Sequence, residues 1–147
     1  MSVDVLTEIV INRPADVVAA YAMDPNNAPE WYVNIKSVEW ETEPPVQLGS
    51  RVAFVARFLG KRLAYTYEIK ELEPGAKMVM GMTEGPFPME TTYEFSPVDE
   101  GSCTMRLRNR GVPTGFAKVG AGLMAAQMRK ANQKDLESIK RILEATA

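Results

Sequence analysis

A single helical pattern extends over residues 116–145, and its length constrains the fold more than any other feature. At 1.5 Å per residue such a helix is about 45 Å long, wider than a small domain. The inward face of its second half carries large apolar residues: Leu136, Ile139, Ile142 and Leu143. The same face of its first half carries small or flexible residues: Gly120, Ala121, Gly122, Met124, Ala125 and Met128. We therefore expect tight packing at one end of the helix and a pocket beneath the other.

Most of the remaining chain shows the alternation and the turn residues of β-strands. Residues 3–11 form the first expected strand, with Val5, Thr7, Ile9 and Ile11 on one face. Two short helices follow, over residues 15–22 and around residues 30–32. Six further strands are expected at about 34–42, 50–59, 62–72, 76–84, 88–96 and 102–110. Short connections between consecutive strands indicate an antiparallel meander, which a strong bend would wrap around the final helix.

The composition is that of one globular domain, which we expect to span residues 1–147. A net charge of −2 gives no general attraction to nucleic acid or to anionic membranes. We see no signal peptide and no apolar run near the roughly 20 residues that cross a bilayer, so we expect a cytoplasmic protein without stable membrane insertion. Cys103 is the only cysteine and there is no histidine, so an internal disulfide and histidine-based catalysis are excluded. We expect no metal and no cofactor.

Candidate ligand-contacting residues are those that the alternation places on the inner face of the sheet or of the final helix. They are Phe54, Tyr65, Tyr67, Met80, Met82, Thr91, Tyr93, Met105, Met124, Met128 and Asn132. The methionines either fill a loose core or line a tolerant apolar site. The tyrosine hydroxyls either reach an edge of the core or orient an oxygen atom of a ligand. Asn132, on the inward stripe, must be hydrogen-bonded or wet, and a ligand contact is one way to achieve this.

Other conspicuous residues are interpreted as structural. Trp31 is expected to close one end of the cavity as a packing residue. The segments 85–88 and 111–116 are interpreted as turns, with a pocket mouth between them as the alternative. The alternation places four charged residues on the outer face, in contact with solvent: Arg57, Glu84, Arg106 and Arg108.

Several segments share their order and spacing with a known superfamily. They are Ile9–Val18, Pro29-Glu30-Trp31, Gly49-Ser50-Arg51, Tyr93–Pro97 with Asp99-Glu100-Gly101, and Asp135–Glu144. Together they resemble the START/Bet v 1-like (SRPBCC) superfamily, in its polyketide cyclase/dehydrase-like branch, over essentially the whole chain. The resemblance implies the α+β helix-grip fold. In that fold a strongly curved seven-stranded antiparallel sheet wraps around a long C-terminal helix, with two short helices between strands 1 and 2.

The chain also lacks two features that occur in some members of the superfamily. The glycine-rich loop of the plant allergen-like members is absent, since residues 43–49 read EPPVQLG. The histidine and arginine arrangement of some aromatase members cannot be transferred to a chain without histidine. Catalytic residues are therefore left unassigned.

Three hypotheses about function remain. The leading one is binding of a small hydrophobic molecule, polyketide-, lipid-, sterol- or quinone-like as the resemblance implies, in a cavity between the sheet and the final helix. The second is a cyclase- or dehydratase-type enzyme acting on an apolar carbonyl compound, with Tyr65, Tyr67 or a cavity carboxylate as acid or base. An inward carboxylate near a tyrosine hydroxyl would favour it. The third is a protein that acts on chaperones or ribosomes, which needs an exposed apolar patch. A homodimer is left open.

Overall fold

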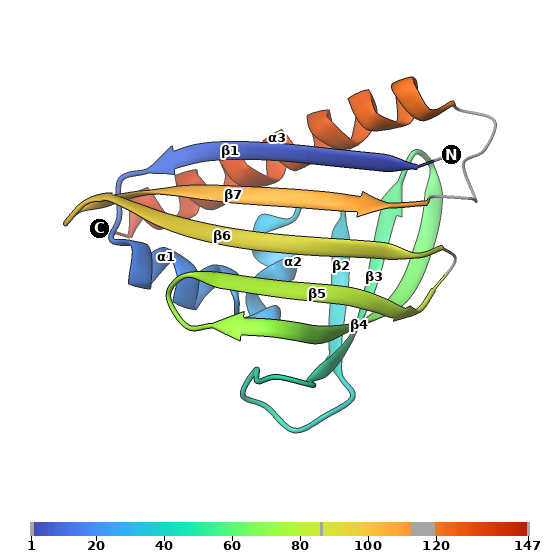
Figure 1. Ribbon diagram of the computed structural model, residues 1–147, viewed down its shortest axis with the longest axis horizontal. Helices are drawn as coiled ribbons and strands as arrows, with labels where there is room; N and C mark the ends of the chain where they lie inside the picture. Colours follow the sequence, from blue (N-terminus) through green and yellow to red (C-terminus); the bar gives the residue numbers. More distant parts are fainter. Residues whose placement is uncertain (1, 86, 113–119, 147) are drawn as a thin grey trace.

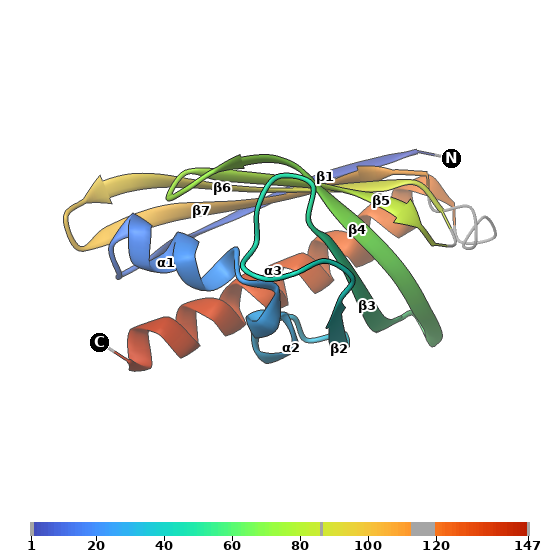
Figure 2. The same cartoon turned by 90° about the horizontal axis from the view of Figure 1, so that it is seen from below.

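The computed structural model describes residues 2–85, 87–112 and 120–146. It contains a sheet, two short helices and a 3-10 turn on its inner side, and one long helix (Figures 1 and 2). The elements are β1 (Val3–Ile11), α1 (Ala15–Ala22), η1 (Pro25–Asn27), α2 (Ala28–Trp31), β2 (Ile35–Trp40), β3 (Arg51–Phe58), β4 (Lys61–Glu73), β5 (Lys77–Glu84), β6 (Met89–Asp99), β7 (Ser102–Gly111) and α3 (Ala121–Ala145). The expected order of elements is confirmed.

The seven strands form one antiparallel sheet in the order β1-β7-β6-β5-β4-β3-β2. Strands β2 to β7 follow one another as a meander, and β1 joins the free edge of β7 with Val3 opposite Gly111 and Ile11 opposite Cys103. The strand bounds agree with the predicted ones to within about three residues, because Pro- and Gly-containing turns mark the ends of most strands. The second short helix begins at Ala28, two residues before the predicted segment, because the 3-10 turn leads directly into it.

The sheet bends sharply along its length. In Figure 1, β2 and β3 run across the direction of β1, β7 and β6. Two irregularities interrupt the pairing of β4 with β5, one at Thr66–Tyr67 and one at Ile69–Glu71, and such bulges increase local bend and twist. The bend turns one face of the sheet inward, and Figure 2 shows α1, α2 and α3 on that side.

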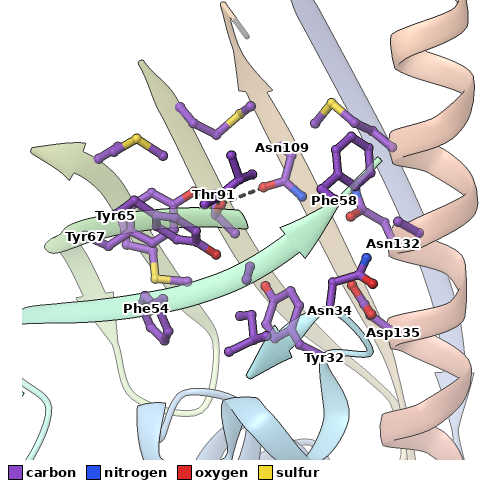
Figure 3. A pocket seen from close by; sticks show the side chains of 18 of the residues that line it. Tyr32, Asn34, Phe54, Phe58, Tyr65, Tyr67, Thr91, Asn109, Asn132 and Asp135 are labelled. Atoms are coloured by element: carbon purple, nitrogen blue, oxygen red, sulfur yellow. Dashed lines mark hydrogen bonds between the residues drawn. The ribbon is translucent and has the colours of Figure 1, made fainter. Parts of the chain in front are cut away.

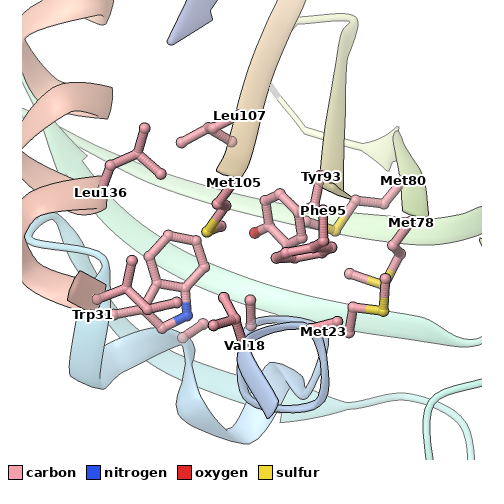
Figure 4. Close-up of a cluster of buried hydrophobic side chains, with 14 of the residues drawn as sticks. Val18, Met23, Trp31, Met78, Met80, Tyr93, Phe95, Met105, Leu107 and Leu136 are labelled. Atoms are coloured by element: carbon pink, nitrogen blue, oxygen red, sulfur yellow. The ribbon is translucent and has the colours of Figure 1, made fainter. Parts of the chain in front are cut away.

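The main hydrophobic core lies under the second half of α3. Figure 4 shows Trp31 among Leu136, Met105 and Tyr93. Trp31 is fully buried, as a packing residue is, but it belongs to this core and is not one of the residues that line the cavity described below. A smaller cluster, made of Val3, Val5, Phe87, Met124 and Met128, lies under the first half of α3. The two halves of α3 therefore pack on different hydrophobic clusters, which agrees with the difference between the halves that the sequence predicts.

Helix α3 is fixed mainly near its C-terminal end. The Arg13 guanidinium donates to the carbonyl oxygen of Leu143 at 2.8 Å, and Lys140 Nζ donates to the carbonyl oxygen of Val10 at 2.8 Å. Glu144 accepts from the backbone N–H of Asn12 at 2.9 Å. These contacts join the end of the helix to the end of β1 and the turn that follows it.

The beginning of α3 corrects the sequence prediction. Residues 116–119 of the predicted helix lie outside the described residues, and Gly120 is the residue before the first helical turn rather than part of it. Gly120, Ala121 and Gly122 are exposed, although the helical spacing placed them inward. The 25-residue helix is about 37 Å long at 1.5 Å per residue. Its inward face on the first half therefore starts at Met124.

Among the helices of the described residues, none combines the length and the apolar character needed to cross a membrane.

Candidate ligand-binding cavity

A cavity opens between the inner face of the sheet and the first half of α3 (Figure 3). It borders both hydrophobic clusters, and every strand from β2 to β7 contributes to its wall. The cavity has a volume of about 140 Å³. The cavity is thus narrow. Much of its wall consists of flexible methionine side chains that can adapt to a ligand: Met80, Met82, Met89, Met124 and Met128.

All but one of the candidate ligand-contacting residues line this cavity. They are Phe54, Tyr65, Tyr67, Met80, Met82, Thr91, Tyr93, Met124, Met128 and Asn132. Met105 is the exception and corrects the prediction: it lies on the inner face but is completely buried in the main core, opposite Phe95 and Ile9. The alternation identified its face correctly, but it could not show how far along β7 the core extends.

Besides Arg57, four polar cavity residues were not among the candidates: Tyr32, Asn34, Asn109 and Asp135. The sequence carried a signal for two of them. Asn109 continues the alternation of Met105 and Leu107 along β7, and the register places it opposite Thr91. Asp135 lies three residues after Asn132, which puts both side chains on the same face of a helix. Tyr32 and Asn34 follow α2 in an irregular segment, where no periodicity applies.

The predicted surroundings of the mouth are described only in part. Phe87, from the segment 85–88, lines the cavity, whereas Pro86 and residues 113–116 lie outside the described residues. Arg57 is exposed, as its outward assignment requires, but it also borders the cavity.

Aromatic rings form the end of the cavity farther from α3. The rings of Tyr65 and Tyr67 are 5.2 Å apart, centre to centre, and each lies within 6.0 Å of the Phe54 ring. The Tyr67 hydroxyl lies 3.1 Å from Oγ1 of Thr91, which donates to Oδ1 of Asn109 at 2.5 Å. Because the single hydroxyl proton of Thr91 is used on Asn109, Tyr67 is the donor of the first bond. This chain of hydrogen bonds links the three side chains to one another.

A second pair of tyrosines lies between the cavity and the core. The hydroxyl oxygens of Tyr32 and Tyr93 are 2.5 Å apart, and the Trp31 ring packs against both side chains. Burial, together with the hydroxyl of Tyr93, raises the pKa of Tyr32 well above its usual value. Burial likewise raises the pKa of Tyr67 to about 12, and that of Tyr65 well above its usual value. These phenols therefore stay neutral near pH 7 and can act as hydrogen-bond donors.

Among the described residues that line the cavity, Asp135 is the one with a carboxyl group. Its side chain is only 3% exposed, and Oδ1 accepts from the backbone N–H of Val33 at 2.8 Å. Burial raises its pKa from the usual 3.8 to about 7, and the hydrogen bond from Val33 opposes this rise. Its charge in turn contributes to the raised pKa values of Tyr32, Tyr65 and Tyr93. A carboxyl group with a pKa near neutrality can both take up and release a proton under physiological conditions.

Some polar groups at the cavity have no hydrogen-bond partner in the described part of the chain. Nδ2 of Asn132 is fully buried without one, in a side chain that is 6% exposed. Such a group costs about 1–3 kcal/mol relative to a paired one. The Tyr65 hydroxyl and the second carboxyl oxygen of Asp135 also make no hydrogen bond to the described residues. Within the same residues, no group of three His, Cys, Asp or Glu side chains could hold a metal ion.

The curved sheet that grips a long helix over an apolar cavity places the protein in the START/Bet v 1-like class. The chain belongs to the family described as polyketide cyclase/dehydrase and lipid transport, whose model matches residues 2–144. This family assignment supports a ligand-binding or cyclase role, with a small apolar molecule as the partner. A search of curated proteins found no match.

Solved structures support the same fold. The Zhui aromatase/cyclase from Streptomyces sp. R1128 has 16% sequence identity and a TM-score of 0.82, over 98% of this chain and 94% of that one. A START superfamily protein from Mycobacterium smegmatis has 11% identity and a TM-score of 0.84, over 98% and 99%. The protein TTHA0849 from Thermus thermophilus has 21% identity and a TM-score of 0.82, over 99% and 100%. At these identities the likeness concerns the fold.

Proposed function

We propose that the protein binds a small, largely apolar molecule, with one polar head group, in the cavity between the sheet and α3. The observation that carries this proposal is the cavity itself: its wall is mainly aromatic and methionine side chains, with amide, hydroxyl and carboxyl groups at a few positions along it. Small-molecule sites in proteins commonly have this composition. In Figure 3 the polar residues Asn34, Asn132 and Asp135 gather beside α3, and this supports binding of the polar head group on that side of the cavity.

Burial of apolar surface supplies most of the expected affinity. A ligand the size of a tryptophan side chain buries roughly 200 Å². At about 25 cal/mol per Å² this contributes roughly 5 kcal/mol before the entropic costs of association. Adding the protein surface that the ligand covers, and hydrogen bonds to its head group, we expect dissociation constants of roughly 1–100 µM for two-ring aromatic molecules.

Titration with the neutral fluorescent probe N-phenyl-1-naphthylamine tests the proposal. We expect saturable binding at one site per chain, with increased probe emission and a rise in the melting temperature, because a ligand that binds only the folded state stabilises it. Non-fluorescent 2-acetylnaphthalene should displace the probe. Emission that never saturates, or no thermal shift at saturating probe, would contradict a defined cavity site.

The second candidate function is an enzyme acting on an apolar carbonyl compound. The observation that favours it is a buried carboxyl group whose pKa is about 7, close enough to three tyrosines for its charge to affect their pKa values. As a base, the Asp135 carboxylate would take a proton from the carbon next to a carbonyl group. The C–H electron pair would form the C=C bond of an enolate, and the Tyr65 hydroxyl would donate a hydrogen bond to its oxygen.

Deuterium uptake into the methyl group of 2-acetylnaphthalene in D₂O measures this reaction directly. If the protein is an enzyme of this kind, uptake exceeds the buffer rate and rises with pH through about 7, where Asp135 loses its proton. Asp135→Asn should reduce uptake to the buffer rate while the variant still binds the ketone. Uptake equal to buffer at every pH, with the ketone bound, would leave binding as the function.

The hypothesis of a protein that acts on chaperones or ribosomes has no comparable support, because the exposed large hydrophobic residues of the described chain are spread over β1, β6, α3 and three connecting segments. They are Leu6, Val10, Val33, Leu48, Leu59, Val98 and Leu123.

A further inference from the structure

Two polar side chains of α3, Asn132 and Asp135, form part of the cavity wall (Figure 3). They are one helical turn apart, and side chains at this spacing have Cβ atoms about 5–6 Å from each other. Both are more than nine-tenths buried, at 6% and 3% exposure. A single small head group can therefore touch both at once.

The hydrogen-bonding capacity of these two side chains is not used up by the described residues. Oδ1 of Asp135 accepts from Val33, whereas Oδ2 makes no hydrogen bond to them. Nδ2 of Asn132 is buried and lacks a partner in the same part of the chain. The other polar pairs of the cavity differ, because Tyr32 bonds to Tyr93, and Tyr67 bonds to Asn109 through Thr91. The groups left to recognise a ligand thus include a donor and an acceptor side by side on α3.

We propose that Asn132 and Asp135 together recognise a ligand head group in which a hydrogen-bond acceptor lies next to a hydrogen-bond donor. This inference rests on the proposed function of the cavity. The acceptor, such as a carbonyl oxygen, receives a hydrogen bond from Nδ2 of Asn132. The neighbouring donor, an amide N–H or a hydroxyl, donates a hydrogen bond to Oδ2 of Asp135. Primary amides and ketones with a neighbouring hydroxyl group have this pattern.

The same arrangement selects against two other head groups. A simple ketone satisfies Asn132 but leaves Oδ2 of Asp135 without a donor, and unpaired buried polar groups are what make such sites selective. A carboxylate ligand places a second negative charge beside Asp135, and like charges this close repel each other strongly in a buried site. The hydroxyl of Tyr65, on β4, makes no hydrogen bond to the described residues. It can donate or accept, and so it does not distinguish these head groups.

Four naphthalenes that differ only in their head group test the recognition at pH 8, where Asp135 is mainly ionised. They are 2-naphthamide, 2-acetylnaphthalene, 2-isopropylnaphthalene and 2-naphthoate. We expect the wild-type protein to bind the amide at least about tenfold more tightly than the ketone, the difference one charge-assisted hydrogen bond makes. The naphthoate should bind at least about tenfold more weakly than the amide.

Two variants assign the preference to these residues. Asp135→Asn keeps an acceptor for Val33 but turns an amide N–H to the ligand, so the preference for amide over ketone should fall to within about twofold and the naphthoate should gain affinity. Asn132→Leu should weaken the amide and the ketone by about fivefold or more and leave 2-isopropylnaphthalene within about twofold. Gln133→Leu, on the same helix and outside the cavity wall, is the control and should change none of these affinities. Melting temperatures establish that each variant is folded.

Failure of the proposed cavity function and failure of the proposed head-group recognition give different results. If none of the neutral naphthalenes binds the wild-type protein, the proposed function of the cavity is wrong. If they bind but the amide has no preference over the ketone, or if the preference survives in Asp135→Asn, the recognition by Asn132 and Asp135 is wrong and the cavity function stands.

Discussion

We expect the variant Asp135→Asn to unfold at a higher urea concentration than the wild type at pH 8, and the two to unfold almost together at pH 4. The wild-type carboxyl group has a folded pKa of about 7 and an ordinary value of 3.8, so the folded protein binds this proton more tightly than the unfolded chain. Stability therefore falls as the pH rises from about 4 to about 7, and the loss persists above pH 7. Three pKa units correspond to about 4 kcal/mol, which is the upper limit of the gain.

Asparagine is the informative replacement because it keeps an oxygen acceptor for the backbone N–H of Val33 and removes the charge. Urea unfolding followed by circular dichroism at pH 4, 6 and 8 gives the free energies. The matched control is Glu137→Gln, which removes an exposed carboxylate from the same helix. It should change the free energy of unfolding by less than about 0.5 kcal/mol at every pH. If Asp135→Asn is no more stable than the wild type at pH 8, the carboxylate is not destabilising in the folded protein.

The second large effect is on binding. Ala131 is half-buried on α3 and lines the cavity, so Ala131→Phe places an aromatic ring in the space that the ligand needs. We expect N-phenyl-1-naphthylamine to bind at least about 30-fold more weakly, since most of the apolar contact is lost. The folded protein should keep its melting temperature within a few degrees, because the ring enters an existing space and displaces little of the core.

Ala126→Phe is the control for this experiment, since Ala126 lies on the exposed face of the same helix. It makes the same chemical change without entering the cavity, and probe affinity should remain within about twofold. Equal loss of binding in both variants would show that helix distortion, rather than filling of the cavity, is responsible. Unchanged binding in Ala131→Phe would place the probe site elsewhere.

The sheet was predictable from the sequence because period-2 alternation and turn residues are local signals. Turn residues such as Gly60 and Pro74-Gly75 predicted where strands end, and the alternation of side chains along a pleated strand predicted which residues share a face. The bulges of β4 were not predictable, because they adjust the pairing between two strands and leave the alternation of each nearly intact. The beginning of α3 was misplaced for a similar reason: helical spacing continues through Gly120–Gly122, but burial depends on the sheet that lies beneath.

The sequence predicted which face of the sheet lines the cavity, but it did not predict the polar groups that decide the chemistry of the site. Alternation placed Tyr65, Tyr67 and Thr91 on the inner face, and all three line the cavity. Whether a residue on that face lies in the core or at the cavity depends on tertiary packing, which is why Met105 was assigned to the wrong region. Asp135 was missed for a further reason. A charged residue beside an apolar stripe normally faces solvent, and only the folded structure shows it buried against the backbone of Val33.

The uneven packing of α3 has an evolutionary consequence. Its second half is joined to the main core and to the end of β1 through Leu136, Ile139 and Arg13, and substitutions there endanger folding. Its first half meets mainly the cavity and the smaller cluster, so substitutions at Met128 or Ala131 alter the ligand space at less cost to stability. In such a helix, substitutions can change the preference of the proposed cavity site for its ligands with little effect on folding. This fits a fold that persists among structures sharing only 11–21% of their residues with this chain.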